Sequence, residues 1–155
     1  MSSAQDFDFL LDGPWVVEHR RLTDAGTWQE FDGTSRVEPL AGGFGHLDRL
    51  VIPASQATGA VEAFTIRLFD PGDGAWRVWW SSSTRPGHLD PPMTGRFVDG
   101  VGTFEGDDLP HTVPTRLRFV WQPHADGGPR WEQARSADGG ATWQTDWTMD
   151  FRRGW

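Results

Sequence analysis

The sequence predicts an all-β domain, in which about ten antiparallel strands close into a barrel after a short N-terminal helical turn. Clusters of Gly, Pro and Asp divide the 155-residue chain into segments of about 6 to 12 residues, a spacing typical of all-β barrels and sandwiches. The segments between these clusters are rich in Val, Phe, Trp and Thr and tend to alternate apolar with polar residues. No window shows a sustained helical stripe, so all three observations favour strands.

Each cluster suits a tight turn, because Gly accepts a positive φ and Asp hydrogen-bonds to its own backbone. A helical turn is expected within residues 4–11. Strands are expected at residues 15–22, 27–39, 45–52, 61–69, 75–82, 93–98, 102–106, 115–122, 130–136 and 143–151. A meander of this kind either leaves two exposed edges or closes on itself, and closure removes the edges. We therefore expect residues 1–155 to form one barrel domain, with a two-sheet sandwich as the alternative.

Side-chain alternation assigns one face of several strands to the interior. The inward sets are Trp143, Thr145, Trp147, Met149 and Phe151; Trp131, Gln133 and Arg135; Leu117, Phe119 and Trp121; Trp15, Val17, His19 and Arg21; and His46, Asp48, Leu50 and Ile52. Gln133 is then a polar group within an aromatic lining. The strands at 61–69 and 75–82 are apolar on both faces, which leaves their inward face open. This two-sided pattern suggests that a partner subunit or the N-terminal segment covers part of the outer wall.

Composition excludes several classes of function. The formal net charge of -8 repels phosphate backbones and anionic membrane surfaces, so we expect neither nucleic acid nor a membrane as a partner. The chain has no Cys, Lys, Tyr or Asn, which excludes disulfides, thiolate nucleophiles, Schiff-base lysines and tyrosine acids. Residues 1–12 have no basic n-region and no long apolar run, which predicts a cytoplasmic protein.

Two stretches near the ends of the chain carry a family resemblance. The opening FDFLLDGPW (residues 7–15) is similar to the short turn and Gly-x-Trp that begin lipocalin-like, or calycin, barrels. Residues 131–133, 136–143 and 147–151 resemble the last hairpin of a bacterial family of uncharacterised lipocalin-like proteins. The resemblance implies a closed antiparallel barrel with an internal cavity, often a homodimer, and supplies no activity. The related nitrobindin-like barrels hold haem through a histidine on a late strand, but the last two expected strands contain none, and we expect no cofactor.

The five histidines show no spacing that would place two metal ligands on one strand or helix, so no metal site is expected. They are His19, His46, His88, His111 and His124. His46 and Asp48 lie two residues apart on one strand face, and His19 reaches the same cavity if its strand comes close. A histidine beside a carboxylate is suited to proton transfer, which makes His46, Asp48 and His19 candidate catalytic residues. A hydrogen-bonded structural pair at the barrel rim is the alternative.

Two arginines also point to a binding site. If Arg67 and Arg135 face inward, each needs a carboxylate or an anionic ligand, because a buried unpaired guanidinium is very costly. Asp48 and Glu132 are the expected partners; the alternative is a ligand that carries a carboxylate or phenolate. The loop at 83–92 has three prolines and is expected to fold over one mouth of the barrel, with Arg85, His88 and Asp90 as further candidates.

Three functions remain open. The first is a binding barrel for a hydrophobic or aromatic small molecule, with Gln133 and His46 fixing its orientation. Its expected ligand-binding residues are Arg67, Trp80, Trp121, Trp131, Gln133 and Trp147. The second is a cofactor-independent isomerase or cyclase for a polyketide-like substrate, with His46 and Asp48 or His19 moving a proton. The third is a dimeric interaction module, in which the ten Trp simply fill the barrel.

Overall fold

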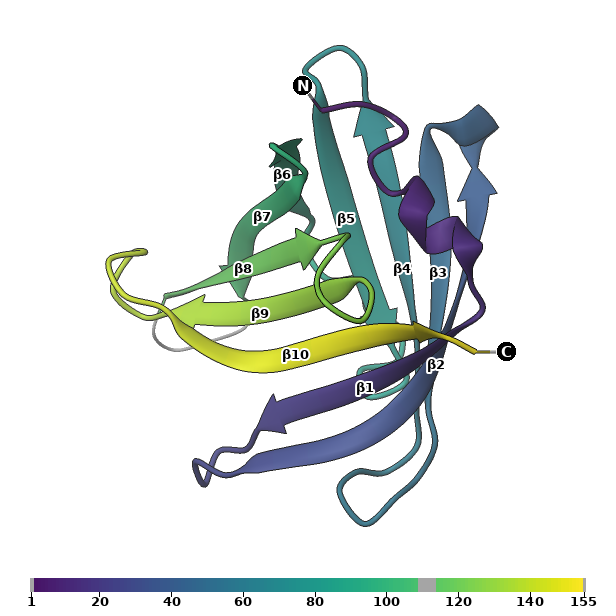
Figure 1. The fold of residues 1–155 in the computed structure, drawn as a ribbon. Coiled ribbons are helices and arrows are strands. Elements are labelled where there is room, and N and C mark those ends of the chain that lie inside the picture. The colour runs from purple at the N-terminus through teal and green to yellow at the C-terminus, as the bar shows by residue number, and fades with distance from the viewer. Residues whose placement is uncertain (1, 109–113, 155) are drawn as a thin grey trace.

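A computed structural model describes residues 2–108 and 114–154, which form a closed barrel of ten antiparallel strands (Figure 1). Every strand pairs with its neighbours in the chain, and β1 pairs with β10 to close the sheet. The strands are β1 (Trp15–Leu22), β2 (Trp28–Leu40), β3 (Gly45–Ile52), β4 (Val61–Asp70), β5 (Ala75–Ser82), β6 (Met93–Val98), β7 (Val101–Asp108), β8 (Thr115–Gln122), β9 (Arg130–Ser136) and β10 (Gln144–Arg153). Two short 3-10 helices, η1 (Asp8–Asp12) and η2 (Ala41–Gly43), accompany them.

The all-β barrel with a short N-terminal helical turn is therefore confirmed, and most strand bounds agree with the expected ranges. β7 is longer than expected, because Asp107 and Asp108 continue the ladder opposite Arg116 and Thr115. The helical turn, η1, is shorter than expected: it begins four residues later than the expected range 4–11 and ends one residue beyond it. The turn at η2 was not expected; it contains Gly42 at a φ of 66°, a conformation that few other residues adopt.

The inward faces follow the predicted alternation in β1, β3, β8 and β9, whose inward residues are buried or line the barrel interior. The structure also resolves the two ambiguous strands. In β4, Ala63, Thr65 and Arg67 are buried inside, whereas Phe64 and Leu68 are exposed outside. In β5, Trp76 and Val78 are buried and Trp80 lines the interior.

The predicted alternation is wrong at the start of β10. The pairing with β9 shifts register between Thr145 and Trp147, so Asp146 is an extra residue in a β-bulge. Thr145 pairs with Ala134 on the outer face, and Asp146 turns inward to bond Gln133. Trp143 also lies outside, where its ring packs 4.4 Å from the Arg118 guanidinium. Trp147, Met149 and Phe151 face inward as expected.

The N-terminal segment closes one end of the barrel. Phe7 and Leu10 are fully buried, and the Phe7 ring packs edge-to-face against Trp76 and Phe97 at 4.9 and 5.0 Å. The Trp15 indole N–H donates to the Leu10 carbonyl at 2.8 Å, and the Trp76 indole N–H donates to Asp6 at 3.2 Å. In Figure 1 this purple segment lies at the end opposite the β9–β10 hairpin.

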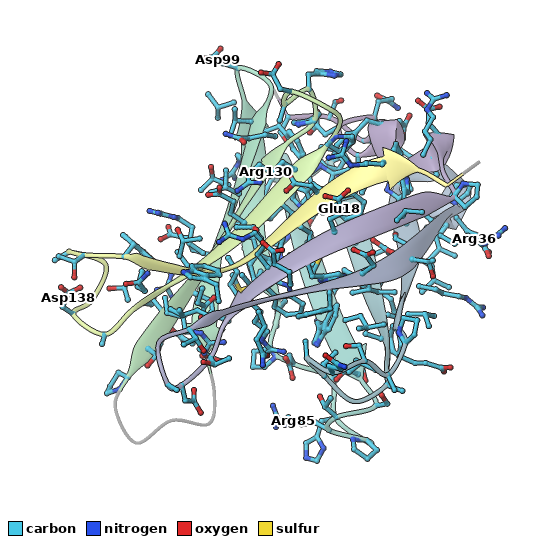
Figure 2. The ribbon with its side chains drawn as sticks, turned by 60° about the horizontal axis from the view of Figure 1, so that its bottom comes forward. Glu18, Arg36, Arg85, Asp99, Arg130 and Asp138 are labelled. Atoms are coloured by element: carbon cyan, nitrogen blue, oxygen red, sulfur yellow. The ribbon has the colours of Figure 1, made fainter. Side chains whose placement is uncertain are left out.

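Because the segment enters the barrel end, it does not cover the outer wall of β4, where Phe64 and Leu68 remain exposed. That part of the sequence interpretation is wrong, and cover by a partner subunit stays a prediction. Figure 2 shows the two ends of the molecule: Asp99, in the β6–β7 turn, marks the closed end, and Arg85, in the loop after β5, marks the other. No helix in the described part of the chain is long and apolar enough to cross a membrane.

Candidate binding cavity

A cavity of about 270 Å³ occupies the barrel interior between the N-terminal segment and the opposite end. Its lining includes the exposed side chains of Arg85 and Asp107, so it reaches the protein surface. The inner wall is aromatic and aliphatic, and charged side chains surround the mouth. The apolar wall is formed by Leu50, Val78, Trp80, Met93, Leu117, Phe119, Trp121, Trp131, Trp147, Met149 and Phe151.

The aromatic wall is held by ring-on-ring packing around Trp147. Its ring is edge-on to Trp131, with centroids 5.4 Å apart, and edge-on to Trp80 at 6.3 Å. Phe119 in turn lies 5.1 Å from Trp131. Such edge-to-face pairs stabilise beyond their buried area and fix the ring planes. The wall is therefore rigid and presents flat apolar surfaces to the cavity.

The floor of the cavity contains a buried ion pair. Arg67, only 3% exposed, donates from Nη2 to Asp48 Oδ2 at 2.7 Å, and the Ser35 hydroxyl donates to Asp48 Oδ1 at 2.7 Å. The rings of Phe7 and Trp121 lie 5.0 and 5.5 Å from the Arg67 guanidinium carbon. The expected Arg67–Asp48 pair is thus present, and both residues line the cavity.

Two donor atoms of Arg67 nevertheless have no hydrogen-bond acceptor among the described residues. Its Nε and Nη1 atoms are buried, and neither finds a hydrogen-bond acceptor within residues 2–108 and 114–154. A buried unpaired donor costs about 1–3 kcal/mol, and more when it belongs to a charged group. Neither atom has accessible surface, so a molecule in the cavity does not reach them, and their missing bonds are a cost of burying this ion pair.

His46 and Asp48 are not hydrogen-bonded to each other. His46 Nε2 lies 3.4 Å from Asp8 Oδ1, and its ring stacks on Trp76 with centroids 6.0 Å apart. Burial, followed by the nearby Arg67 charge, lowers the pKa of His46, and Asp8 partly opposes this shift. His46 contacts the N-terminal segment and is not among the residues that line the cavity.

His19 lies behind the aromatic wall. The Trp147 indole N–H donates to His19 Nδ1 at 3.1 Å, which leaves the histidine proton on Nε2 in the neutral ring. The ring of Phe31 stacks on the imidazole, with centroids 4.8 Å apart. Gly33 leaves space for the imidazole, because a Cβ at this position would lie only 3.2 Å from His19 Nε2. Burial, together with the charge of Arg21, lowers the pKa of His19 to about 4. His19 is therefore a neutral acceptor, and its hydrogen bond positions the Trp147 ring.

Arg135 lies at the mouth between two carboxylates. Its guanidinium bonds Asp108 and Asp146, and Gln133 donates to the same Asp146 at 2.9 Å. The prediction that Glu132 pairs with Arg135 is wrong. Glu132 faces the outside and accepts from Arg130 at 3.1 Å.

Further charges complete the mouth. Arg85 Nη1 lies 3.3 Å from Asp90 Oδ1. The guanidinium carbon of Arg21 lies 4.6 Å from the centroid of the Trp147 ring. Burial raises the pKa of Asp90. Asp90 N–H also bonds the Trp80 carbonyl at 2.8 Å, which holds the loop at 83–92 against the end of β5. The expected position of this loop at a mouth of the barrel is confirmed, and Arg85 and Asp90 line the cavity.

The structure brings together most of the predicted site. The expected ligand-binding residues Arg67, Trp80, Trp121, Trp131, Gln133 and Trp147 all line the cavity. Of the candidate catalytic residues, Asp48 lines it, while His19 and His46 lie behind its walls. Sequence reasoning missed Asp146 and Phe7, because one depends on a bulge and the other on the path of the N-terminal segment.

Comparison with known proteins assigns the chain to no family. No protein-family model matches the chain, and no curated protein matches its sequence. Within residues 2–108 and 114–154, no group of three or more His, Asp or Glu side chains is placed to hold a metal ion. His111, one of the five histidines considered from the sequence, lies outside the described residues. The fold class, a closed antiparallel β-barrel consistent with a lipocalin-like fold, is therefore the identification that the structure supports.

Proposed function

We propose that this protein is a binding barrel for a hydrophobic, aromatic small molecule, which occupies the cavity between the N-terminal segment and the mouth. The observation that carries the proposal is the cavity itself, whose wall is aromatic and aliphatic and whose lining reaches the protein surface at Arg85 and Asp107. In a barrel filled only for stability, side chains would occupy this space, because an interior void forfeits packing contacts.

The size and lining of the cavity support the same proposal. An apolar cavity of about 150 Å³ is enough to hold benzene. The volume of about 270 Å³ therefore suits two fused aromatic rings with one polar substituent. The flat faces of Trp80, Trp131 and Trp147 favour planar ligands, and the polar atoms at floor and mouth supply orientation.

The test is a titration of intrinsic Trp fluorescence with naphthalene, 2-acetylnaphthalene, 2-naphthol and 2-naphthoate. We expect saturable quenching at one site by at least one member of this panel. Leu117→Trp places a larger side chain in the cavity and should weaken binding at least tenfold, because the added ring occupies the ligand volume. Val120→Trp, on the outer face of the same strand, is the matched control and should bind as the wild type does.

Two results would contradict the proposal. One is a wild-type protein whose fluorescence no member of the panel changes. The other is an equal response of the Leu117→Trp and Val120→Trp variants, which would place the binding site outside the cavity.

A cofactor-independent isomerase or cyclase of a polyketide-like substrate is the second candidate. Its support is that Asp48 lines the cavity beside Arg67, so a carboxylate and a cation face the same space. Binding is the better-supported function, because both Asp48 oxygens already accept bonds, from Arg67 and from Ser35. The predicted partner His46 faces Asp8 instead.

A further inference from the structure

We propose that two copies of this chain associate through the outer wall of β3, β4 and β5, as a dimer with two-fold symmetry. The proposal concerns the outside of the barrel, so it stands apart from the ligand in the cavity. Six apolar side chains project from this wall, and we call them the outer apolar face. They are Leu47, Val51, Phe64, Ile66, Leu68 and Trp79.

The side chains of the outer apolar face are neighbours across three strands. Leu47 on β3 pairs with Ile66 on β4, and Ile66 pairs with Trp79 on β5. Phe64 and Leu68 lie on either side of Ile66 along β4, and they are 37% and 38% exposed. In Figure 1 these three strands run side by side on one wall of the barrel. A contiguous apolar patch of this kind marks an interaction site.

Nothing in the described part of the chain covers this face. The N-terminal segment enters the end of the barrel, where Phe7 and Leu10 are buried, while Val51, Phe64 and Leu68 remain exposed. Contact between water and this apolar surface is unfavourable, and a partner that excludes the water removes the cost.

Four exposed charged side chains lie within or beside the face. They are Arg36, Glu38, Arg49 and Glu62. None of the four makes an ion pair with a residue that the structure describes, and Figure 2 shows Arg36 on the outside of the barrel. Their charges balance, although the whole chain carries a formal charge of -8. This face is therefore a place where two copies of an acidic chain meet without net repulsion.

The arrangement of these charges fits a second copy of the same face. Arg36 lies directly opposite Arg49 in the β2–β3 ladder, and like charges in this position destabilise a sheet. The row that begins at Arg36 continues to Phe64 on β4, and the next row runs from Glu38 to Ile66. Charge and apolar side chain thus occupy matching places in two adjacent rows.

A two-fold axis that crosses the strands between these rows makes the two copies complementary. The rotation turns one face towards the other and exchanges the rows, as in an isologous interface. Arg36 of each copy then meets Glu38 of the other, and Phe64 meets Ile66. The facing strands stay aligned, as they do in packed sheets. Each Glu38 carboxylate also approaches Arg49, so it offsets the repulsion between the two arginines.

The dimer should be weak. Six partly exposed side chains form a small interface, and small interfaces are typical of transient complexes. We therefore expect a monomer in dilute solution and a dimer at higher concentration, with a dissociation constant in the micromolar range.

Sedimentation equilibrium, from micromolar to hundreds of micromolar protein, tests the surface. Phe64→Glu places a charge at the centre of the face and should keep the chain monomeric throughout. Val98→Glu is the matched control, because Val98 is 65% exposed in the β6–β7 region, away from this wall, and its variant should associate as the wild type does. A wild type that stays monomeric throughout, or a Phe64→Glu variant that still dimerises, would overturn the proposal.

Exchange of the two charges tests the symmetry. Arg36→Glu and Glu38→Arg each place like charges at both contacts of the homodimer, so each variant alone should associate roughly tenfold more weakly or worse. An equimolar mixture of the two variants should recover the wild-type affinity, because the mixed dimer has opposite charges at both contacts. Single variants that associate normally, or a mixture that shows no recovery, would overturn the two-fold pairing.

Discussion

The two ends of the barrel are built from the same ten strands but closed by different chemistry. At one end, Phe7 and Leu10 are fully buried among aromatic rings, and indole N–H groups bond the N-terminal segment. At the other, arginines and aspartates surround an opening into the cavity. The contrast shows how one sheet can hold a sealed floor and an accessible mouth.

The energetics of the two ends differ for a physical reason. Burial of an aromatic side chain removes a large apolar area from water and stabilises the fold at any salt concentration. Partly exposed ion pairs contribute little and are weakened by salt. We therefore expect the closed end to determine stability, and the open end to determine which molecules reach the cavity.

The largest expected effect is at the closed end. Phe7→Ala should lower the free energy of unfolding by about 3–5 kcal/mol, because it leaves a cavity among packed rings. Phe64→Ala on the outer wall is the control, and its 37% exposure predicts a clearly smaller loss. Both are measured by urea denaturation. Equal losses in the two variants would show that the N-terminal segment does not seal the barrel.

The second-largest expected effect is a loss of stability in acid, where His19 behind the aromatic wall becomes protonated. Because the pKa of His19 is about 4 in the folded protein and ordinarily 6.5, the unfolded chain binds the proton more readily. The stability that neutral His19 supports is complete above about pH 6.5 and falls as the pH drops towards 4. The loss should reach about 2 kcal/mol by pH 5.

Unfolding at a series of pH values tests this expectation. His19→Gln keeps an acceptor for the Trp147 indole but does not titrate, so its stability should depend less steeply on pH. His88→Gln, in the exposed loop after β5, is the control and should follow the wild type. A slope that is the same in wild type and His19→Gln would be evidence against the neutral buried histidine.

The smallest expected effect is at the open end. Arg135→Gln breaks the bonds to Asp108 and Asp146, yet the Arg135 side chain is 37% exposed. We expect a loss of about 1 kcal/mol or less in low salt, and a smaller difference from wild type at 1 M salt. A loss as large as that of Phe7→Ala would remove the distinction between the two ends.

The strands and most inward faces could be predicted because they depend on local patterns. Alternation of side chains placed Trp131, Gln133 and Arg135 together, and all three line the cavity. The ambiguous β4 shows the limit of this signal. Phe64 and Leu68 are exposed on the outer face, and their apolar character hid the inward position of Arg67.

Two features of the site could not be predicted from alternation. The bulge at Asp146 adds one residue to β10, which turns this carboxylate inward and moves Thr145 to the outer face. The second feature is the path of the N-terminal segment, which brings Asp8 to His46 and so changes the histidine's partner. The apolar residues Phe7 and Leu10, three apart in the sequence, were the available signal for a buried segment.

The closure of the barrel between β1 and β10 also constrains how the protein is made. During vectorial synthesis, β1 leaves the ribosome first, but its second pairing partner is the last strand to emerge. Until then, a nascent sheet has an open edge along β1 and a matching gap where β10 will lie. Unpaired backbone groups therefore remain along the β1 edge until the last strand has been made, and the barrel closes only then.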